Sequence, residues 1–138
     1  MADASYLPAR LSASQLAAIA SELDAFVTAI PGIHAAVIAS VDGFALAQAS
    51  GVGNGDRLAA MTSSMLGLAK AVTTELALGT MEVLMLEAAD GKVLMLSIPA
   101  PSRPLLLMAA CSQRTVIGAV LWNARECSQR ILSACAAS

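Results

Sequence analysis

The strongest constraint on the fold is a pair of apolar runs joined by Asp42-Gly43. The runs cover residues 34–41 and 44–49, and an Asp-Gly pair between two such runs is typical of the tight turn of a β-hairpin. Pro31-Gly32 precedes the hairpin and ends a helical pattern. A glycine-rich loop at 50–55 follows it. The chain therefore begins with a helix, a hairpin and a second helix.

The first helix is predicted to begin after Ser12. Ser12 and Gln15 have the spacing of a capping box. Residues 1–11 are predicted to be a flexible N-terminal tail, and residues 12–138 a single domain. Apolar residues then recur at helical spacing on one face, namely Leu16, Ile19, Leu23, Phe26, Val27 and Ile30.

The second helix is predicted to run from Asp56 to Ala77, with Gly79 in its C-cap region. No charged residue occurs between Leu58 and Ala69. A helix covered on one side carries charges on the other, so we expect this helix to be covered on two sides. It has a stripe of large apolar residues (Leu58, Met61, Met65, Leu68, Val72, Leu76) and one of small residues (Ala60, Ser64, Gly67, Ala71, Thr74).

The second half of the chain predicts three more strands and a last helix. Residues 81–87 and 92–98 flank Asp90-Gly91, a second hairpin signal, and residues 105–110 form a fifth strand. These runs are continuously apolar, whereas the strands of a sheet with one solvent-exposed face alternate between apolar and polar residues. Helices are therefore expected on both faces of the sheet. The element order is αββαβββα, an α+β fold with a five-stranded antiparallel sheet between helices.

The last helix is predicted over about 115–134, with one apolar and one polar face. Trp122 and Arg125 fall on the polar face. A tryptophan there either lies flat on the surface or anchors a partner. We therefore take Trp122 and Arg125 as a candidate partner surface.

Composition indicates that some apolar surface is covered by something other than the chain itself. With 57% apolar residues and a mean hydropathy of +0.72, the 138 residues hold more than one core needs. Pro31-Gly32 breaks the longest charge-free run, so no transmembrane segment is predicted. The first residues lack a signal-peptide pattern, which favours a cytoplasmic location. Three layers in so short a chain are expected to leave part of the second helix and one sheet edge open, and a second copy of the chain is expected to cover both.

Signals for nucleic-acid binding, metal binding and catalysis are weak. The net charge is −2 and the basic residues are scattered, so no nucleic-acid partner is expected. Cys111, Cys127 and Cys135 lack Cys-x-x-Cys spacing, which favours buried free thiols over disulfides or zinc ligands. The loop before Asp56 lacks Walker spacing, and no cofactor is expected. An enzyme using Cys111 or the single histidine, His34, is the least supported class.

The chain resembles the Roadblock domain family, which includes Roadblock-type dynein light chains and bacterial GTPase regulators. The resemblance covers about residues 16–134. It implies a profilin-like three-layer α/β/α sandwich that forms homodimers, with the central helices packed together and the third strands paired. It rests on the order of Ile30-Pro31-Gly32-Ile33, the segment 36–43, Arg57-Leu58-Ala59-Ala60, Leu66-Gly67-Leu68-Ala69, Leu78-Gly79 and Ile117-Gly118-Ala119-Val120.

The resemblance also implies a function without a catalytic centre. The expected role is a homodimeric regulator or scaffold that binds a small Ras-like GTPase, with GTPase activation as one form of regulation. The alternative is a homodimeric adaptor in a larger complex that has no GTPase partner. No arginine is marked as an arginine finger. The expected dimer interface comprises Ala60, Met61, Ser64, Gly67, Leu68, Ala71, Glu82 and Leu84.

Overall fold

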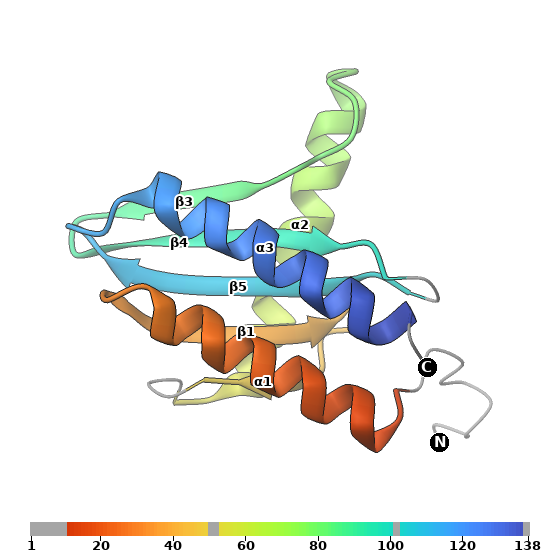
Figure 1. The fold of residues 1–138 in the computed structure, drawn as a ribbon. Helices are drawn as coiled ribbons and strands as arrows, with labels where there is room; N and C mark the ends of the chain where they lie inside the picture. Colours follow the sequence, from red (N-terminus) through yellow and green to blue (C-terminus); the bar gives the residue numbers. More distant parts are fainter. Residues whose placement is uncertain (1–10, 50–52, 101–102, 137–138) are drawn as a thin grey trace.

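The predicted element order and the α+β class are confirmed (Figure 1). The computed structural model describes residues 11–49, 53–100 and 103–136, so residues 1–10 of the predicted tail lie outside the described residues. The helices are α1 (Ala13–Ala29), α2 (Gly55–Glu75) and α3 (Ile117–Ala136). The strands are β1 (Ile33–Ser40), β2 (Ala45–Gln48), β3 (Leu84–Ala88), β4 (Gly91–Ile98) and β5 (Leu105–Ser112).

The strands form one antiparallel sheet in the order β2-β1-β5-β4-β3. The predicted hairpins are present as β1-β2 and β3-β4. In the second hairpin, however, Ala88 pairs with Gly91, so the turn is Ala89-Asp90 and Gly91 belongs to β4. A β-carbon on Gly91 would lie 2.9 Å from the carbonyl oxygen of Cys111. This glycine therefore permits close strand packing rather than a turn.

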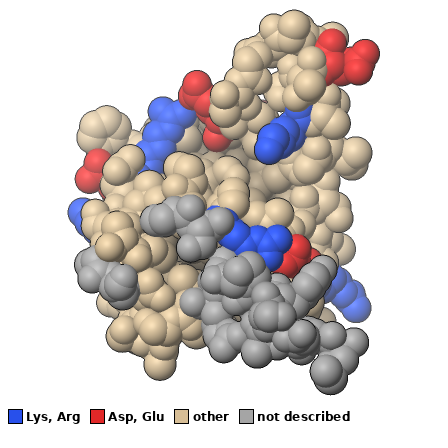
Figure 2. Space-filling model, turned by 90° about the vertical axis from the view of Figure 1, so that its right-hand side faces the viewer, with Lys and Arg blue, Asp and Glu red and all other residues tan. Residues whose placement is uncertain are grey.

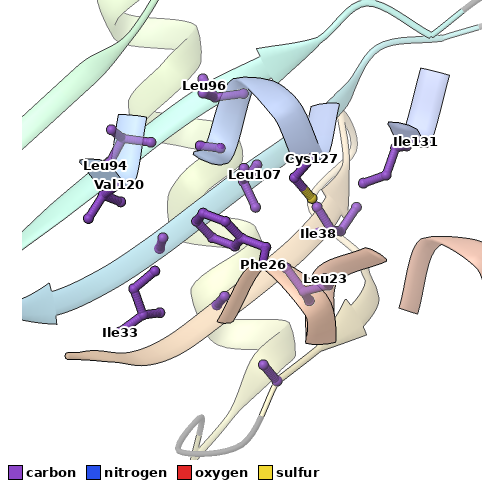
Figure 3. Packing of buried hydrophobic residues seen from close by; sticks show 14 of the residues in the cluster. Leu23, Phe26, Ile33, Ile38, Leu94, Leu96, Leu107, Val120, Cys127 and Ile131 are labelled. Atoms are coloured by element: carbon purple, nitrogen blue, oxygen red, sulfur yellow. The ribbon is translucent and has the colours of Figure 1, made fainter. Parts of the chain in front are cut away.

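Helices α1 and α3 cover one face of the sheet (Figure 1). The predicted capping box of α1 is present: the Gln15 amide donates to the Ser12 hydroxyl at 3.1 Å, and the Ser12 amide donates to Gln15 Oε1 at 2.8 Å. The main core lies between this helical layer and the sheet (Figure 3). Its labelled members are Leu23, Phe26, Ile33, Ile38, Leu94, Leu96, Leu107, Val120, Cys127 and Ile131.

Helix α2 covers the opposite face, which confirms the expected three layers (Figure 1). It packs against β1, β2, β4 and β5. The second core is smaller, and its buried members are Val37, Ala39, Ala59, Leu66, Met95, Leu106 and Met108.

Coverage of the sheet is incomplete at β3. From Met85 to Ala88 the residues of this strand are exposed, although the sequence is apolar enough to predict burial. The strand also begins at Leu84 rather than Met81. Helices therefore cover both faces of the sheet over β1, β4 and β5, and β3 is the sheet edge that one chain leaves open, as expected.

Candidate interaction site

The N-terminal half of α2 is fixed firmly on the sheet. Asn54 caps the helix by accepting a hydrogen bond from the Arg57 amide at 3.0 Å. Ala59, Thr62 and Leu66 form the buried face of the helix. The Thr62 hydroxyl is buried but satisfied, because it donates to the carbonyl of Leu58 at 2.8 Å. This half of the helix is thus held by a cap and by packing.

The β1-β2 turn adds polar links to the same half of the helix. The Ser63 hydroxyl donates to the Val41 carbonyl. The Ala45 amide donates to Asp56 Oδ1 at 3.4 Å. These bonds join α2 to the hairpin on which its first turns rest.

The C-terminal half of α2 projects beyond the β3 edge of the sheet (Figure 1). No described residue between 67 and 82 is buried. The projecting half carries large apolar side chains, and Leu68, Val72 and Leu76 are 68%, 55% and 61% exposed. Figure 2 shows this end at the top of the molecule as a mostly uncharged surface with a few charged side chains. One protomer therefore leaves an apolar helix end in water.

The α2 residues of the predicted dimer interface share one outward face. They lie opposite the buried line of Ala59, Thr62 and Leu66, as their offsets along a helix require. Ala60 also lies against Gly43 of the β1-β2 turn, and the other members are free to contact a partner along this face. The exposed members are Ala60, Met61, Ser64, Gly67, Leu68 and Ala71.

Sequence reasoning left two exposed residues of α2 out of the predicted interface. Val72 and Leu76 continue the stripe of Leu68 toward the helix end, and both are exposed. Their helical spacing was the available signal, because residues three or four apart share a face. With Leu78 in the following loop, 67% exposed, they extend the apolar surface past the end of α2.

Strand β3 gives the site a second component, an open sheet edge. Among the described strands it pairs with β4 alone. Met85 and Leu86 are exposed on opposite faces of this strand, and Leu84 packs partly against the smaller core. An apolar edge strand with unpaired backbone groups is a template for strand pairing. The projecting helix and the open edge lie on the same side of the molecule (Figure 1).

The two predicted surfaces meet where α3 passes the beginning of β3. Arg125, a candidate partner residue, lies 3.5 Å from the carboxylate of Glu82, a predicted interface residue. Both side chains are largely exposed, so this ion pair contributes little to stability. Trp122 is 69% exposed, which confirms its place on the polar face of α3.

The three cysteines are free thiols, as predicted. Cys111 and Cys127 are buried and Cys135 is half-buried. Burial raises the pKa of all three, and that of Cys127 to about 11. Thiols with raised pKa values are poor nucleophiles. His34 lies exposed at the beginning of β1.

Two further kinds of feature are absent from the described residues. No group of three or more histidine, cysteine, aspartate or glutamate side chains there is arranged to hold a metal ion. No helix in the described part of the chain is long and apolar enough to cross a membrane.

Solved structures share this fold at low sequence identity. MglB from Myxococcus xanthus superposes with a TM-score of 0.78 at 14% identity, over 90% of this chain and 92% of that one. The gliding protein MglB from Thermus thermophilus superposes with a TM-score of 0.78 at 13% identity, over 93% of this chain and 96% of that one. A Roadblock/LC7 domain from Streptomyces avermitilis superposes with a TM-score of 0.71 at 16% identity, over 82% of this chain and 91% of that one.

Sequence comparison identifies the family directly. No curated protein matches the chain significantly. The family model of the Roadblock/LC7 domain, however, matches residues 19–99, which is more than half of the chain and includes α2 and β3. The chain therefore belongs to the Roadblock/LC7 domain family.

Proposed function

We propose that this protein is a homodimeric, non-catalytic regulator or scaffold that binds a small Ras-like GTPase. The observation that carries the proposal is the apolar end of α2 projecting beside the open edge of β3. Family membership and the fold shared with MglB support a role in regulation of a GTPase pathway.

The length of α2 supports a second copy as the cover of this surface. One helical turn rises about 5.4 Å, and neighbouring strands lie about 4.8 Å apart, so a helix that crosses a sheet passes about one strand per turn. The last buried residue, Leu66, belongs to the smaller core together with Met95 of β4. Residues 67–75 add about 13 Å. That length carries the helix past the position of β3, which stays exposed within one chain, and over a strand that a partner would add.

The edge of β3 supports the same arrangement. Two β3 strands related by a two-fold axis would pair in antiparallel fashion and continue the sheet, as the family resemblance implies. Each α2 end would then lie over the strands of its partner. Burying Leu68, Val72 and Leu76 would contribute about 1–2 kcal/mol each. An isologous interface uses every such contact twice.

The GTPase is assigned to the surface that dimerisation leaves uncovered. Trp122 on α3 points away from the sheet and lies outside the surface formed by α2 and β3. Exposed tryptophan and arginine side chains are enriched among residues that dominate binding energy. We therefore place the partner contact at Trp122 and Arg125.

Binding measurements with purified proteins test the proposal. A small Ras-like GTPase encoded near this protein would be immobilised in its GDP-bound and GTP-bound forms. We expect binding of the dimer with a preference for one nucleotide state. The absence of binding to any such GTPase, by a chain shown to be dimeric, would contradict the regulator role without affecting the dimer.

The alternative is a homodimeric adaptor in a larger complex. It shares the dimer surface of α2 and β3 and differs only in the partner. The absence of binding to the GTPase in either nucleotide state, by a chain shown to be dimeric, would select the adaptor. Substitution of Cys111 by serine and of His34 by alanine addresses an enzymatic role, and we expect both variants to keep full binding.

A further inference from the structure

The C-terminal half of α2 has few interactions within one chain that keep it helical. Its first residue, Gly67, lies in the helix interior, where glycine is unfavourable. Val72, Thr73 and Thr74 are three consecutive β-branched residues, which also have low helix propensity. Because no described residue from 67 to 82 is buried, packing within the protomer does not compensate.

The end of the helix is also unfavourable. Ala77 adopts a positive φ of 55°, a conformation that alanine adopts at a cost and glycine at almost none. The Leu78 amide donates to the Thr73 carbonyl at 2.9 Å, and the Ala77 amide to the Thr74 carbonyl at 3.1 Å. This pattern closes a helix in which glycine is the usual residue at the left-handed position.

The two halves of α2 therefore differ sharply in the number of contacts within the chain that stabilise them. The first half has the Asn54 cap, the buried Ala59 and Leu66, and hydrogen bonds to the hairpin. The second half has backbone hydrogen bonds, exposed leucines and a strained last turn. The packed first half nucleates the helix, so its extension over residues 67–75 depends on helix propensity, which is close to balance in water without tertiary contacts.

We propose that residues 67–75 of α2, with the closing turn that ends at Leu78, become stably ordered only when a second copy of the chain covers them. Ordering of this segment and dimerisation are then one coupled step. The inference rests on the proposed homodimer and adds how its interface forms. A second copy is the occupant because it offers the same projecting apolar helix and the same open β3 edge, which are self-complementary about a two-fold axis.

The coupling makes the dimer surface dependent on concentration. In a monomer, residues 67–78 exchange between helix and open states, and their apolar side chains form no fixed surface. Part of the interface free energy orders this segment, so the dimer is weaker than its buried area indicates. Binding of a partner that recognises only the dimer would then depend on the fraction of the protein that is dimeric.

Hydrogen exchange of the full chain, measured without any GTPase, tests the coupling. Sedimentation equilibrium first gives the dimer fraction at each concentration. We expect amides in 67–78 to exchange at least about tenfold more slowly in the dimer, and those in 58–66 to change much less. Equal protection of 67–78 in the monomer overturns the proposal. A dimer with unprotected 67–78, or a chain that is monomeric at every concentration, overturns it as well.

Val72→Lys separates a coupled helix from an independent one. Lysine has higher helix propensity than valine, its charge suits the last turns of a helix and lies three residues before Glu75, and the site is exposed in the protomer. An independent helix would therefore gain protection in this variant. A coupled helix would lose both the dimer and the protection of 67–78, because an ammonium group would enter the interface. Thr28→Lys is the matched control, since Thr28 is an exposed β-branched residue of α1, which covers the opposite face of the sheet, and it should leave both unchanged.

Neither experiment depends on the identity or existence of a GTPase. Failure of GTPase binding with concentration-dependent protection would leave the coupling intact and remove only the proposed partner. If the protection of residues 67–78 did not depend on protein concentration, in a chain that binds a GTPase, the coupling would be excluded and the proposed function would stand.

Discussion

Gly43 in the β1-β2 turn lies directly against Ala60 of α2. A β-carbon on Gly43 would stand 3.2 Å from the Ala60 α-carbon, and the residue has a φ of +92°. Both the backbone conformation and the lack of space therefore require glycine at this position. The hairpin turn therefore connects two strands and also packs against α2, the helix that carries the candidate interaction surface.

Replacing Gly43 with alanine is expected to lower the free energy of unfolding by about 2 kcal/mol. The new β-carbon would add the cost of a positive φ to that of a close contact with α2. Urea unfolding followed by circular dichroism measures the loss. Gly118→Ala is the control, because a β-carbon there meets nothing within 4 Å. Equal losses in the two variants would argue against the specific contact.

Ala77→Gly is expected to raise the free energy of unfolding of the dimer by about 0.5–1 kcal/mol. Glycine removes the cost of the positive φ of 55° at the end of α2. The control is Ala20→Gly in the exposed interior of α1, outside the expected dimer interface, which should lower stability by about 1 kcal/mol. Opposite signs at the two alanines are the diagnostic result. A loss at both positions would mean that Ala77 is not strained.

Local signals in the sequence were sufficient for most of the fold. Ser12 and Gln15 predicted the beginning of α1, and Asp42-Gly43 predicted the first hairpin, because each pattern acts through backbone hydrogen bonds between near neighbours. The end of α2 was predicted less well. Gly79 was expected in the cap region, but Ala77 takes the first left-handed position and the helix ends at Glu75. Propensity favours glycine there but does not exclude alanine.

The candidate site depends on tertiary packing, which sequence patterns describe less completely. The two stripes of α2 were visible in the sequence, but they did not show that the narrow line of Ala59, Thr62 and Leu66 would face the sheet. The apolar run of β3 predicted burial, yet one chain leaves the strand exposed. A pattern reports that a surface is apolar and does not say which molecule covers it.

Cys127 should make the protein less stable in alkali. Its thiol lies between α3 and α1, 3.6 Å from the Glu22 carbonyl oxygen, and burial, helped by the Glu22 charge, raises its pKa from 9.0 to about 11. Because the native state holds this proton more tightly than the unfolded chain, the stabilisation is complete below pH 9 and is lost as pH rises through 11. The loss amounts to about 2 kcal/mol.

Urea unfolding of the native chain and of Cys127→Ala at pH 8 and pH 11 measures this contribution. We expect the difference between the two proteins to shrink or reverse at the higher pH, since only the chain that keeps Cys127 has a thiol that ionises more readily when it is unfolded. Other groups titrate equally in both proteins and cancel. An unchanged difference would show that Cys127 keeps an ordinary pKa.

Gly67→Trp is expected to prevent dimerisation without unfolding the protomer. A β-carbon at Gly67 meets nothing within 4 Å in the chain, so the indole has room in a monomer and would separate two packed α2 helices. Sedimentation velocity at micromolar concentration should show a dimer for the native chain and a monomer for the variant. Gly118→Trp, also at an open position, should remain dimeric. Dimers of both variants would place the interface elsewhere.

Trp122→Ala is expected to weaken binding of the GTPase by about tenfold or more, because a tryptophan at the centre of an interface often dominates its energy. Its side chain is largely exposed, so the free energy of unfolding should change by less than about 0.5 kcal/mol. Trp122 is the only tryptophan in the chain, and its fluorescence gives an independent measurement. Its emission should shift to the blue when the partner covers it. Tight binding by the alanine variant, together with unshifted emission in the native chain, would exclude Trp122 from the partner surface.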